Sequence, residues 1–339
     1  MNMDSRFRGS DDPIRWNGST HFESDSSRRC WGEPMGRPLP RFALFLSSAV
    51  GLLAAQGALA DDVLGNKPRH VWGGPSSVPN GQAITRMIWA PGLDDGYVPQ
   101  GVTWAEGAVF LSAYRSTDPK IGKGPCRVFK VDAQSGETLA QFDLPKDCGH
   151  AGGLAHVGNG FLVVSDTPRL YKINSAAAFS GSSSPTAIEA TVKLGGEVKG
   201  SFVGFDGTSL FVGSYDKDAD KAKGHFLPLS IFDTHRHKIV TEGDASRAIP
   251  LPTDAQGAAF DRAGMLWLSA SSSKFGRLYR LESASGRVLS SHDMVIGIED
   301  LAFDERGKLW SVSEAGSLRW QKWSAAFPVL FQVDPSRLK

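Results

Sequence analysis

Polar side chains recur at two corresponding positions along this 339-residue sequence, each time beside a short apolar segment. One position lies at the start of the first apolar segment of a repeating unit, and the other follows the second segment. The side chains at these positions are Gln100, Tyr114, Arg115, His150, Asp166, Tyr215, Gln256, Glu299 and Glu314. Carboxylates, amides, phenols and an imidazole gathered in one place can bind a polar small molecule or a cation. These residues are therefore the predicted ligand-binding set.

His150 and Glu299 are the members of this set that would be catalytic if the protein is an enzyme. A histidine acts as a general base or a ligand when a second group orients its ring. Asp166, Glu299 or Glu314 could orient His150, and the alternative is a histidine bonded to a neighbouring loop carbonyl. Glu299 and Glu314 could also hold a divalent cation such as Ca²⁺, with carbonyl and water oxygens completing its shell.

A repeated phrase provides the elements that must position these residues. FDERGKLW at 303–310 matches FDRAGMLW at 260–267, and FDGTSLF at 205–211 is one residue shorter. Each copy reads as a strand, a tight turn and a second strand, because Asp can bond back into the turn and Gly supplies a positive φ. A phrase that recurs about every 50 residues is typical of a propeller or solenoid.

The repeats align as five blades, each with a first, second and third apolar strand. In the third blade we expect the third strand at 229–233 and the fourth at 238–241. The last blade lacks a fourth strand of its own, so Ile84–Trp89 is predicted to supply it and close the ring; closure hides an edge that would otherwise be open. The prediction is an all-β, five-bladed propeller. Six blades remain the alternative, with the extra blade in 61–98 or 175–200.

The first 60 residues are expected to lie outside this fold. Residues 35–60 read as a signal peptide, with a basic start, an apolar run too short to span a bilayer, and an Ala-Leu-Ala cleavage site at 58–60. Residues 1–34 precede it and are interpreted as a mis-called extension. The mature domain is then 61–339, and we expect it in the periplasm or secreted, as a monomer without a membrane span.

Charge and cysteine content describe the mature domain further. Seven of the 37 basic and six of the 36 acidic residues lie in 1–60, which leaves 30 of each. A net charge of zero gives no field that would attract nucleic acid. Cys126 begins one strand and Cys148 follows its antiparallel neighbour, so the two lie within bridging reach, and export favours a disulfide over two free thiols.

The repeated hairpins resemble those of the SMP-30/gluconolactonase, NHL and YncE-like propellers. Three further phrases, PQG at 99–101, GHAGGLA at 149–155 and EAG at 314–316, resemble secreted bacterial propeller proteins of this superfamily. The resemblance covers about residues 95–335. It implies a metal-dependent lactonase as one possible activity, but the Glu-Gly-Pro phrase of those enzymes is absent from this sequence.

Three functions follow from these observations as hypotheses. The first is binding of a small polar or carbohydrate-like ligand at the channel mouth, where Trp320 and Trp323 could stack on a sugar ring or plug the channel. The second is a lactonase- or esterase-like hydrolase that uses His150 or Glu299 with a divalent cation. The third is a scaffold that binds another protein of the cell envelope.

Overall fold

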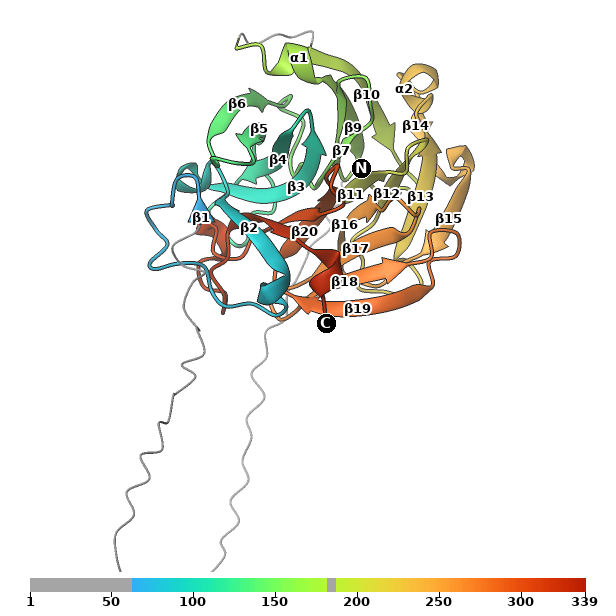
Figure 1. The fold of residues 1–339 in the computed structure, drawn as a ribbon. Coiled ribbons are helices and arrows are strands. Elements are labelled where there is room, and N and C mark those ends of the chain that lie inside the picture. Colours follow the sequence, from blue (N-terminus) through green and yellow to red (C-terminus); the bar gives the residue numbers. More distant parts are fainter. Residues whose placement is uncertain (1–62, 182–186) are drawn as a thin grey trace, which may run out of the picture. The chain divides into compact units, whose positions relative to one another are not determined.

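The structure is a computed structural model that describes residues 63–181 and 187–339. The predicted signal peptide at 35–60 and the segment 1–34 lie outside the described residues. The described chain forms five β-sheets around one axis, which confirms the predicted five-bladed propeller (Figure 1). We number the sheets as blades 1 to 5 in the chain order of their innermost strands.

Each blade runs from an innermost strand at the axis to an outer edge strand. Blade 1 consists of β3 (Tyr97–Ala105), β4 (Ala108–Arg115), β5 (Cys126–Asp132) and β6 (Thr138–Asp143). Blade 2 consists of β7 (Gly153–His156), β8 (Phe161–Asp166), β9 (Arg169–Asn174), β10 (Ile188–Leu194) and β14 (Ile239–Val240). Blade 3 consists of β11 (Phe202–Phe205), β12 (Ser209–Gly213), β13 (Lys223–Pro228) and β15 (Arg247–Pro250). Blade 4 consists of β16 (Ala255–Phe260), β17 (Leu266–Ser271), β18 (Gly276–Leu281) and β19 (Val288–Met294). Blade 5 consists of β20 (Ile298–Phe303), β21 (Leu309–Ser313), β22 (Val329–Val333), β2 (Ile84–Trp89) and β1 (Val63–Leu64).

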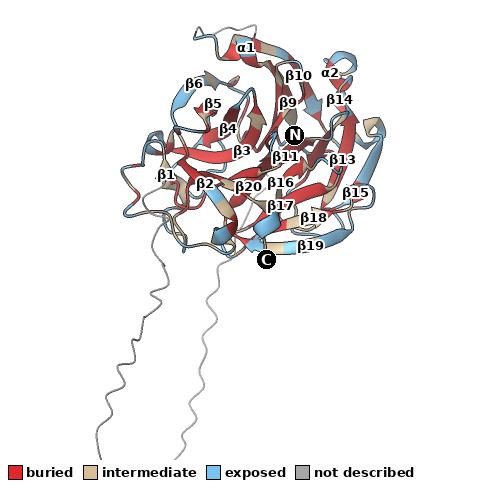
Figure 2. Ribbon diagram, in the orientation of Figure 1, coloured by how far each residue is buried: buried red, intermediate tan, exposed pale blue. Residues whose placement is uncertain are grey.

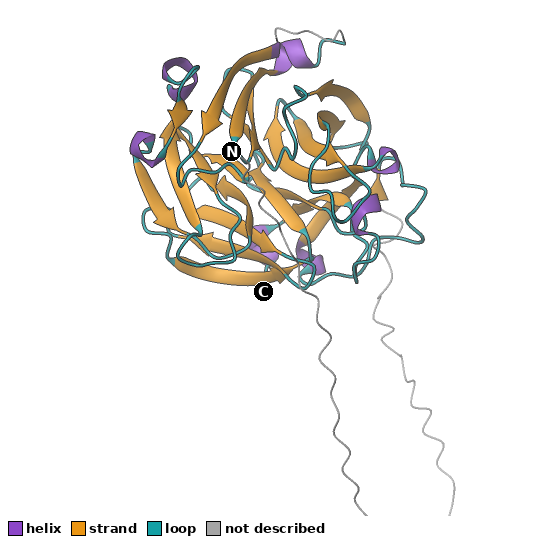
Figure 3. Ribbon diagram, turned by 180° about the vertical axis from the view of Figure 1, so that it is seen from behind, coloured by secondary structure: helices purple, strands orange, loops and turns teal. Residues whose placement is uncertain are grey.

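Helices are short and lie in the connections between strands, except η6, which follows the last strand (Figure 3). They are α1 (Ser175–Ala178), α2 (Ile231–Thr234) and the 3₁₀ turns η1 (Gly81–Ala83), η2 (Leu93–Asp95), η4 (Glu242–Asp244), η5 (Leu318–Trp320) and η6 (Pro335–Arg337). No helix in the part of the chain that the structure describes is long and apolar enough to cross a bilayer.

The innermost strands close into a ring. β3 contacts β7, β7 contacts β11, β11 contacts β16, β16 contacts β20, and β20 returns to β3. The N-terminal segment completes the last blade as predicted, since β2 pairs antiparallel with β22 and joins Ile84 to Val333 and Trp89 to Val329. The ring is therefore fastened by strands from both ends of the described chain.

The repeated hairpins owe their geometry to the predicted Asp and Gly. Asp304 Oδ1 accepts the backbone N–H groups of Arg306 and Lys308, both at 2.9 Å, and Gly307 has φ of 74°. The tryptophan that ends the phrase adds a contact, because Trp310 Nε1 donates to Asp304 Oδ2 at 3.3 Å. One aspartate thus holds both the turn and the following strand.

Burial is greatest on the inner and middle strands, and exposed residues gather on the outer strands β6, β15 and β19 (Figure 2). Apolar side chains of adjacent blades pack together; Phe260 of blade 4, for example, meets Phe211 of blade 3 with ring centroids 5.8 Å apart. This packing between blades forms the core and fixes where each blade ends near the axis.

Two strand predictions for blade 3 are wrong. Its third strand is β13 at 223–228, and part of the predicted strand at 229–233 forms α2 instead. The predicted fourth strand at 238–241 contains β14, but β14 pairs parallel with β10 of blade 2, while β15 forms the outer strand of blade 3. Gly224 and a buried His225 interrupt the apolar alternation of β13, which explains why the pattern pointed to the more apolar segment after it.

The cysteine pair forms the predicted disulfide. Cys126 and Cys148 are bonded with their Cα atoms 5.9 Å apart. β5 and β6 pair antiparallel and join Arg127 to Asp143, so the start of one strand lies beside the end of the other. The bridge fastens the segment that immediately precedes His150 to blade 1.

Candidate functional site

The candidate site centres on two carboxyl groups at one end of the axis, Glu299 on β20 and Glu314 directly after β21. Both belong to blade 5, where β20 and β21 pair side by side. Glu299 is 2% exposed and Glu314 is 8% exposed. Two predicted glutamines reach them from neighbouring blades: Gln100 Nε2 donates to Glu314 Oε2 at 3.2 Å, and Gln256 Nε2 donates to Glu299 Oε1 at 3.3 Å. The structure therefore brings four of the predicted residues together.

Burial determines the protonation of this carboxyl pair. Burial raises the pKa of Glu314 to about 7, against the effect of its hydrogen-bond donors, which lower it. The pKa of Glu299 lies well above its usual value because of burial first, and then because of the nearby Glu314 and Asp300 carboxyls. Near neutral pH the pair therefore retains a proton, so it can both donate and accept hydrogen bonds.

An aromatic group borders the carboxyl pair. Trp320 Nε1 donates to Glu314 Oε2 at 2.7 Å, and the Trp320 ring stacks on Trp323 with centroids 4.8 Å apart and an interplanar angle of 25°. Both tryptophans lie on the connection between β21 and β22. One face of the site is thus aromatic, and the indole N–H of Trp320 fixes this ring against Glu314.

Arg319, which the sequence analysis did not single out, connects the tryptophans to blade 1. Its guanidinium lies over the Trp320 ring at 4.2 Å and donates to the Tyr114 hydroxyl. The same group donates to the carbonyls of Asp118 and Pro119 at 3.2 and 3.1 Å. Its positive charge lowers the pKa of both glutamates, which partly offsets their burial. Arg319 thus places a fixed cation beside the carboxyl pair.

Tyr114 and His150 extend this network on the blade 1 side. Tyr114 is fully buried, and burial followed by the Glu314 carboxyl raises its pKa, so it stays a phenol. The His150 ring stacks on it with centroids 4.6 Å apart. His150 therefore reaches the carboxyl pair only indirectly, through its stack on Tyr114 and the bond from Tyr114 to Arg319.

His150 is oriented by a loop carbonyl, which was the alternative to a carboxylate partner. Its Nδ1 lies 2.8 Å from the Gly122 carbonyl oxygen, which can only accept, so Nδ1 carries the proton and Nε2 has the lone pair in the neutral ring. Asp166 instead accepts the backbone N–H of His150 at 2.7 Å. Burial lowers the pKa of His150, which favours the neutral imidazole.

Two predicted residues lie at the margin of the site. Arg115 is exposed, and its Nε donates to the Asp95 carbonyl at 2.8 Å rather than to a group of the carboxyl pair. Tyr215 is 37% exposed, and its pKa is raised by burial and then by a hydrogen bond with Asp254. They could contact a ligand only at its outer end.

Asp300, next to Glu299, closes the axis below the carboxyl pair. It is fully buried, and its Oδ2 accepts the backbone N–H groups of Leu154 at 2.8 Å and Val102 at 3.2 Å. Its Oδ1 accepts the N–H of Ala258 at 3.3 Å. Burial raises the pKa of Asp300, and these donors act against that shift. One side chain of blade 5 thus ties the innermost strands of blades 1, 2 and 4.

Glycines make this closure possible. Gly101 and Gly257 hold the position in blades 1 and 4 that Asp300 holds in blade 5, and a Cβ on Gly257 would overlap the Asp300 Cα atom. A Cβ on Gly101 would lie 2.7 Å from the backbone of Gly153 in blade 2. The innermost strands of neighbouring blades therefore lie in close contact at the level of Asp300.

The carboxyl pair by itself is a poor fit for the divalent cation that the sequence suggested. Calcium takes six to eight oxygen ligands, most of them carboxylates and carbonyls. Glu299 and Glu314 each receive an amide N–H, and their raised pKa values favour a proton over a bare carboxylate pair. No group of three or more Asp, Glu, His or Cys side chains in 63–181 and 187–339 has the arrangement of a metal site. We therefore derive no step through a metal.

Comparisons with known proteins identify no family. No protein-family model matches the chain, and no curated protein matches it. Among solved structures it is similar to Myxococcus xanthus glutaminyl cyclase, with 15% identity over 74% of this chain and 97% of that one and a TM-score of 0.48. It is also similar to the PQQ-bound aldose sugar dehydrogenase from Streptomyces coelicolor, with 13% identity over 76% and 99% of the two chains and a TM-score of 0.44. A luciferin-regenerating enzyme shows 13% identity over 78% and 97% and a TM-score of 0.41. Similarity this distant carries no functional argument, so function must be argued from the site.

Proposed function

We propose that this protein binds a small polar ligand with several hydroxyl groups at the end of the axis where Glu299 and Glu314 lie. The observation that carries the proposal is the buried carboxyl pair, in which each group receives only one or two hydrogen bonds from the protein. Glu299 Oε2 and Glu314 Oε1 have no hydrogen-bond partner among the described residues. Neither oxygen is fully enclosed by the protein, so both are open to a ligand or to water at the site.

The surrounding groups favour a hydroxylated ligand. A carboxyl pair that retains a proton can donate to one hydroxyl and accept from another, and the amides of Gln100 and Gln256 add further polar atoms at the rim. The Trp320 ring is already covered by Arg319 and Trp323, so Trp323 is the ring that would offer an apolar platform beside these polar groups. This combination suits a sugar-like ring, which has polar edges and apolar C–H faces.

The proposed place of action is outside the cytoplasm. The Cys126–Cys148 disulfide is of the kind that persists in an oxidising compartment. The sequence pattern at 35–60 supports export independently of the fold. We therefore propose a periplasmic or secreted binding protein.

A hydrolase is the second candidate, and the pKa of Glu314 favours it specifically. A carboxyl group with a pKa of about 7 is suited to proton transfer near neutral pH. As a base, Glu314 would take a proton from water as the water oxygen attacks an ester or lactone carbonyl. The acyl C–O bond would then break, and Glu314 would return the proton to the departing oxygen. Glu299 would lie beside the reacting carbonyl in this scheme.

The test is a thermal-shift screen of residues 61–339 with monosaccharides, sugar acids and polyols, followed by calorimetry of any hit. A ligand present at 100 times its Kd stabilises the native state by about 2.7 kcal/mol, which corresponds to a rise in Tm of roughly 5 °C or more. Gln256→Ala should abolish the shift, because it frees Glu299 from its only amide donor. Gln134→Ala, in an exposed turn, is the matched control and should keep it.

Two results would contradict the proposal. The first is the absence of a shift with any hydroxylated ligand, which would favour a protein-binding role for the ring. The second is an equal shift in the wild type and in Gln256→Ala. Turnover of a lactone or ester that is lost in Glu314→Gln but retained in Gln134→Ala would make the hydrolase the leading function.

A further inference from the structure

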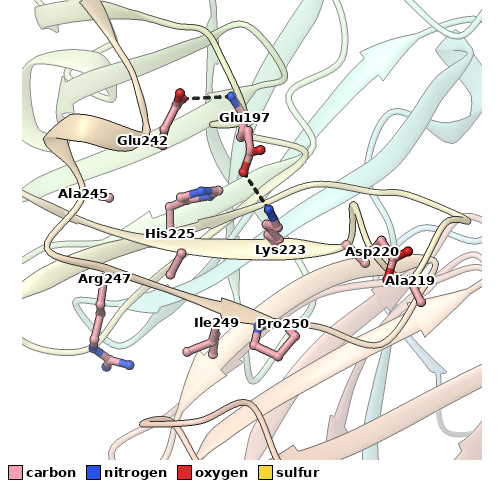
Figure 4. Close-up of a pocket in the computed structure, with 12 residues that line it drawn as sticks. Glu197, Ala219, Asp220, Lys223, His225, Glu242, Ala245, Arg247, Ile249 and Pro250 are labelled. Atoms are coloured by element: carbon pink, nitrogen blue, oxygen red, sulfur yellow. Dashed lines mark hydrogen bonds and ion pairs between the residues drawn. The ribbon is translucent and has the colours of Figure 1, made fainter.

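A second cavity lies away from the axis, between blades 2 and 3, and has a volume of about 430 Å³ (Figure 4). Its walls come from β13, β15, η4 and the loops that follow β10 and β12. A cavity of this size lies within the range of small-molecule sites. None of its residues belongs to the carboxyl pair or to the network around it.

His225 on β13 is the residue that points to a ligand. It is 2% exposed, and its ring makes no hydrogen bond with any of the described residues. The ring lies in the cavity on the same side as Glu197 and Glu242 (Figure 4). The ring nitrogens are not fully enclosed, so they are open to the cavity. A ligand with a polar head in the cavity could bond to them in place of water.

The charges around His225 favour a cation. Glu197, Glu242 and Asp220 line the cavity, and Lys223 is its one ammonium, bound to Glu197 at 2.8 Å. Arg247 also borders the cavity, but its guanidinium lies 3.4 Å from the centre of the Phe226 ring and donates to the Ser283 carbonyl. Figure 4 shows the Arg247 side chain directed away from His225. The acidic groups at this end of the cavity therefore exceed the basic ones.

Glu242 is held in place to receive such a cation. Its Oε2 accepts the backbone N–H of Glu197 at 3.1 Å. Backbone N–H groups, its own first and then that of Glu197, lower the pKa of Glu242, so its carboxyl stays ionised near neutral pH. Burial lowers the pKa of His225, so its ring is neutral under the same conditions and offers a nitrogen lone pair.

The rest of the cavity wall is aliphatic. On the face of blade 3 that carries His225, this wall consists of Ala245, Ala248 and Pro250. Ile249 and Ala222 pack into the core on the opposite face. No aromatic side chain lines it, so nothing here matches the stacking platform at the axis. Methyl and methylene groups favour a hydrocarbon chain over a sugar ring.

We propose that this cavity, which we call the inter-blade site, binds an aliphatic amine. The ammonium lies among His225, Glu242 and Glu197, and the hydrocarbon chain lies against Pro250, Ala245 and Ala248. The same chemistry is found in a free aliphatic diamine and in the lysine side chain of another protein. The inference does not depend on the ligand proposed for the axis.

The experiment titrates residues 61–339 with hexylamine and with hexan-1-ol, which has nearly the same shape but no charge, by calorimetry. We expect hexylamine to bind at least about tenfold more tightly, since a charge-assisted hydrogen bond is roughly twice as strong as a neutral one. The His225 ring signals in NMR should shift on addition of hexylamine. Equal affinity for the two probes, no binding of either, or unshifted His225 signals would overturn the proposal.

Substitutions in the inter-blade site test where the ammonium group of the ligand binds. Glu242→Gln retains an oxygen that can accept the Glu197 N–H but removes the charge, and it should weaken hexylamine about tenfold. Glu189→Gln removes an exposed carboxylate on β10 and should change nothing. Glu314→Gln should also leave hexylamine binding unchanged, which separates this site from the axial one. Unchanged affinity in Glu242→Gln would count against the proposal.

Two further probes distinguish the source of the amine. 1,6-Diaminohexane represents a free diamine, and Nα-acetyl-lysinamide represents a lysine side chain within a protein. Tighter binding of the diamine would assign the inter-blade site to a small molecule. Tighter binding of the lysine derivative would assign it to a partner protein. Failure of both to bind would contradict the proposal even if hexylamine binds.

Discussion

Asp300 should contribute more to the stability of this propeller than any other single carboxyl group we describe. Its two oxygens accept three backbone N–H groups, at 2.8, 3.2 and 3.3 Å, from the innermost strands of three other blades. Asp300→Ala would leave these three N–H groups buried and without partners. Each such group costs about 1–3 kcal/mol, and two of the three bonds are long. We therefore expect a loss of about 4 kcal/mol in the free energy of unfolding.

Asp300→Asn makes the expectation more specific. The asparagine oxygen can replace Oδ2 and still accept from Val102 and Leu154. Its NH₂ group, however, would face the N–H of Ala258, where two donors meet. Only one of the three contacts is lost, so this variant should lose roughly 1–3 kcal/mol, less than the alanine variant.

Equilibrium urea unfolding, followed by tryptophan fluorescence, measures both losses. Asp206→Ala is the matched control, because Asp206 also accepts two backbone N–H groups, those of Thr208 and Ser209 at 2.8 and 2.7 Å. That turn is exposed, so water replaces the lost bonds and the loss should be about 1 kcal/mol. An Asp300→Ala variant as stable as the control would refute the reasoning that the axial carboxyl ties the blades together.

Two other predictions concern Glu314 and the disulfide. The folded-state pKa of Glu314, about 7, lies above its usual value of 4.5, so its contribution to stability is full below about pH 4.5 and is lost as pH rises through 7. The loss due to Glu314 is about 3 kcal/mol. Unfolding at pH 5 and pH 8 should show a loss of stability that is larger by about this amount in the wild type and in the exposed control Glu305→Gln than in Glu314→Gln, where the raised pKa values of Glu299 and Asp300 still act. A wild-type protein that is equally stable at both values would contradict the assignment. Replacing Cys126 and Cys148 with Ser opens a loop defined by a separation of 22 residues and should cost about 3 kcal/mol. A reductant should destabilise the wild type to the same extent and leave the double variant unchanged; a double variant with wild-type stability would show that the bridge is energetically neutral.

The fold could be predicted because its determinants are local and repeated. Each FDxxGxLW phrase contains its own turn, in which the aspartate binds the backbone and the glycine supplies the positive φ. Strand β2 had no neighbouring strand in the sequence to pair with, and the last blade lacked an outer strand. Pairing β2 with the last blade was therefore the prediction that satisfied both. Blade 3 departed from this logic because Gly224 and His225 interrupt β13, and α2 carries a more apolar sequence than the strand before it.

The site could be predicted only where it follows the repeat. Gln100, Gln256 and Glu299 hold equivalent positions in three blades, so the closure of the ring was enough to bring them to one end of the axis. Arg319 is different: it lies on an irregular connection and meets Tyr114 from 205 residues away in sequence. Such a contact depends on tertiary packing that no local pattern records.

Asp300 could have been found from a different kind of signal. It occupies the position at which blades 1 and 4 have Gly101 and Gly257. A single acidic residue aligned with glycines indicates a side chain that fills the space left by those glycines. His225 gave no such signal, since its lack of a partner becomes visible only in three dimensions.

The closure of the axis also decides what kind of function the ring can have. On the far side of Asp300 a separate cavity of about 200 Å³ is lined by residues that include Thr103, Val203 and Leu301. Between the two ends, the Asp300 side chain lies across the axis, where it bonds to the innermost strands of blades 1, 2 and 4. A ligand at Glu299 and Glu314 must therefore enter and leave on one side, past the connection that carries Arg319 and Trp320. A site that opens on one side of Asp300 suits binding or hydrolysis of a small molecule.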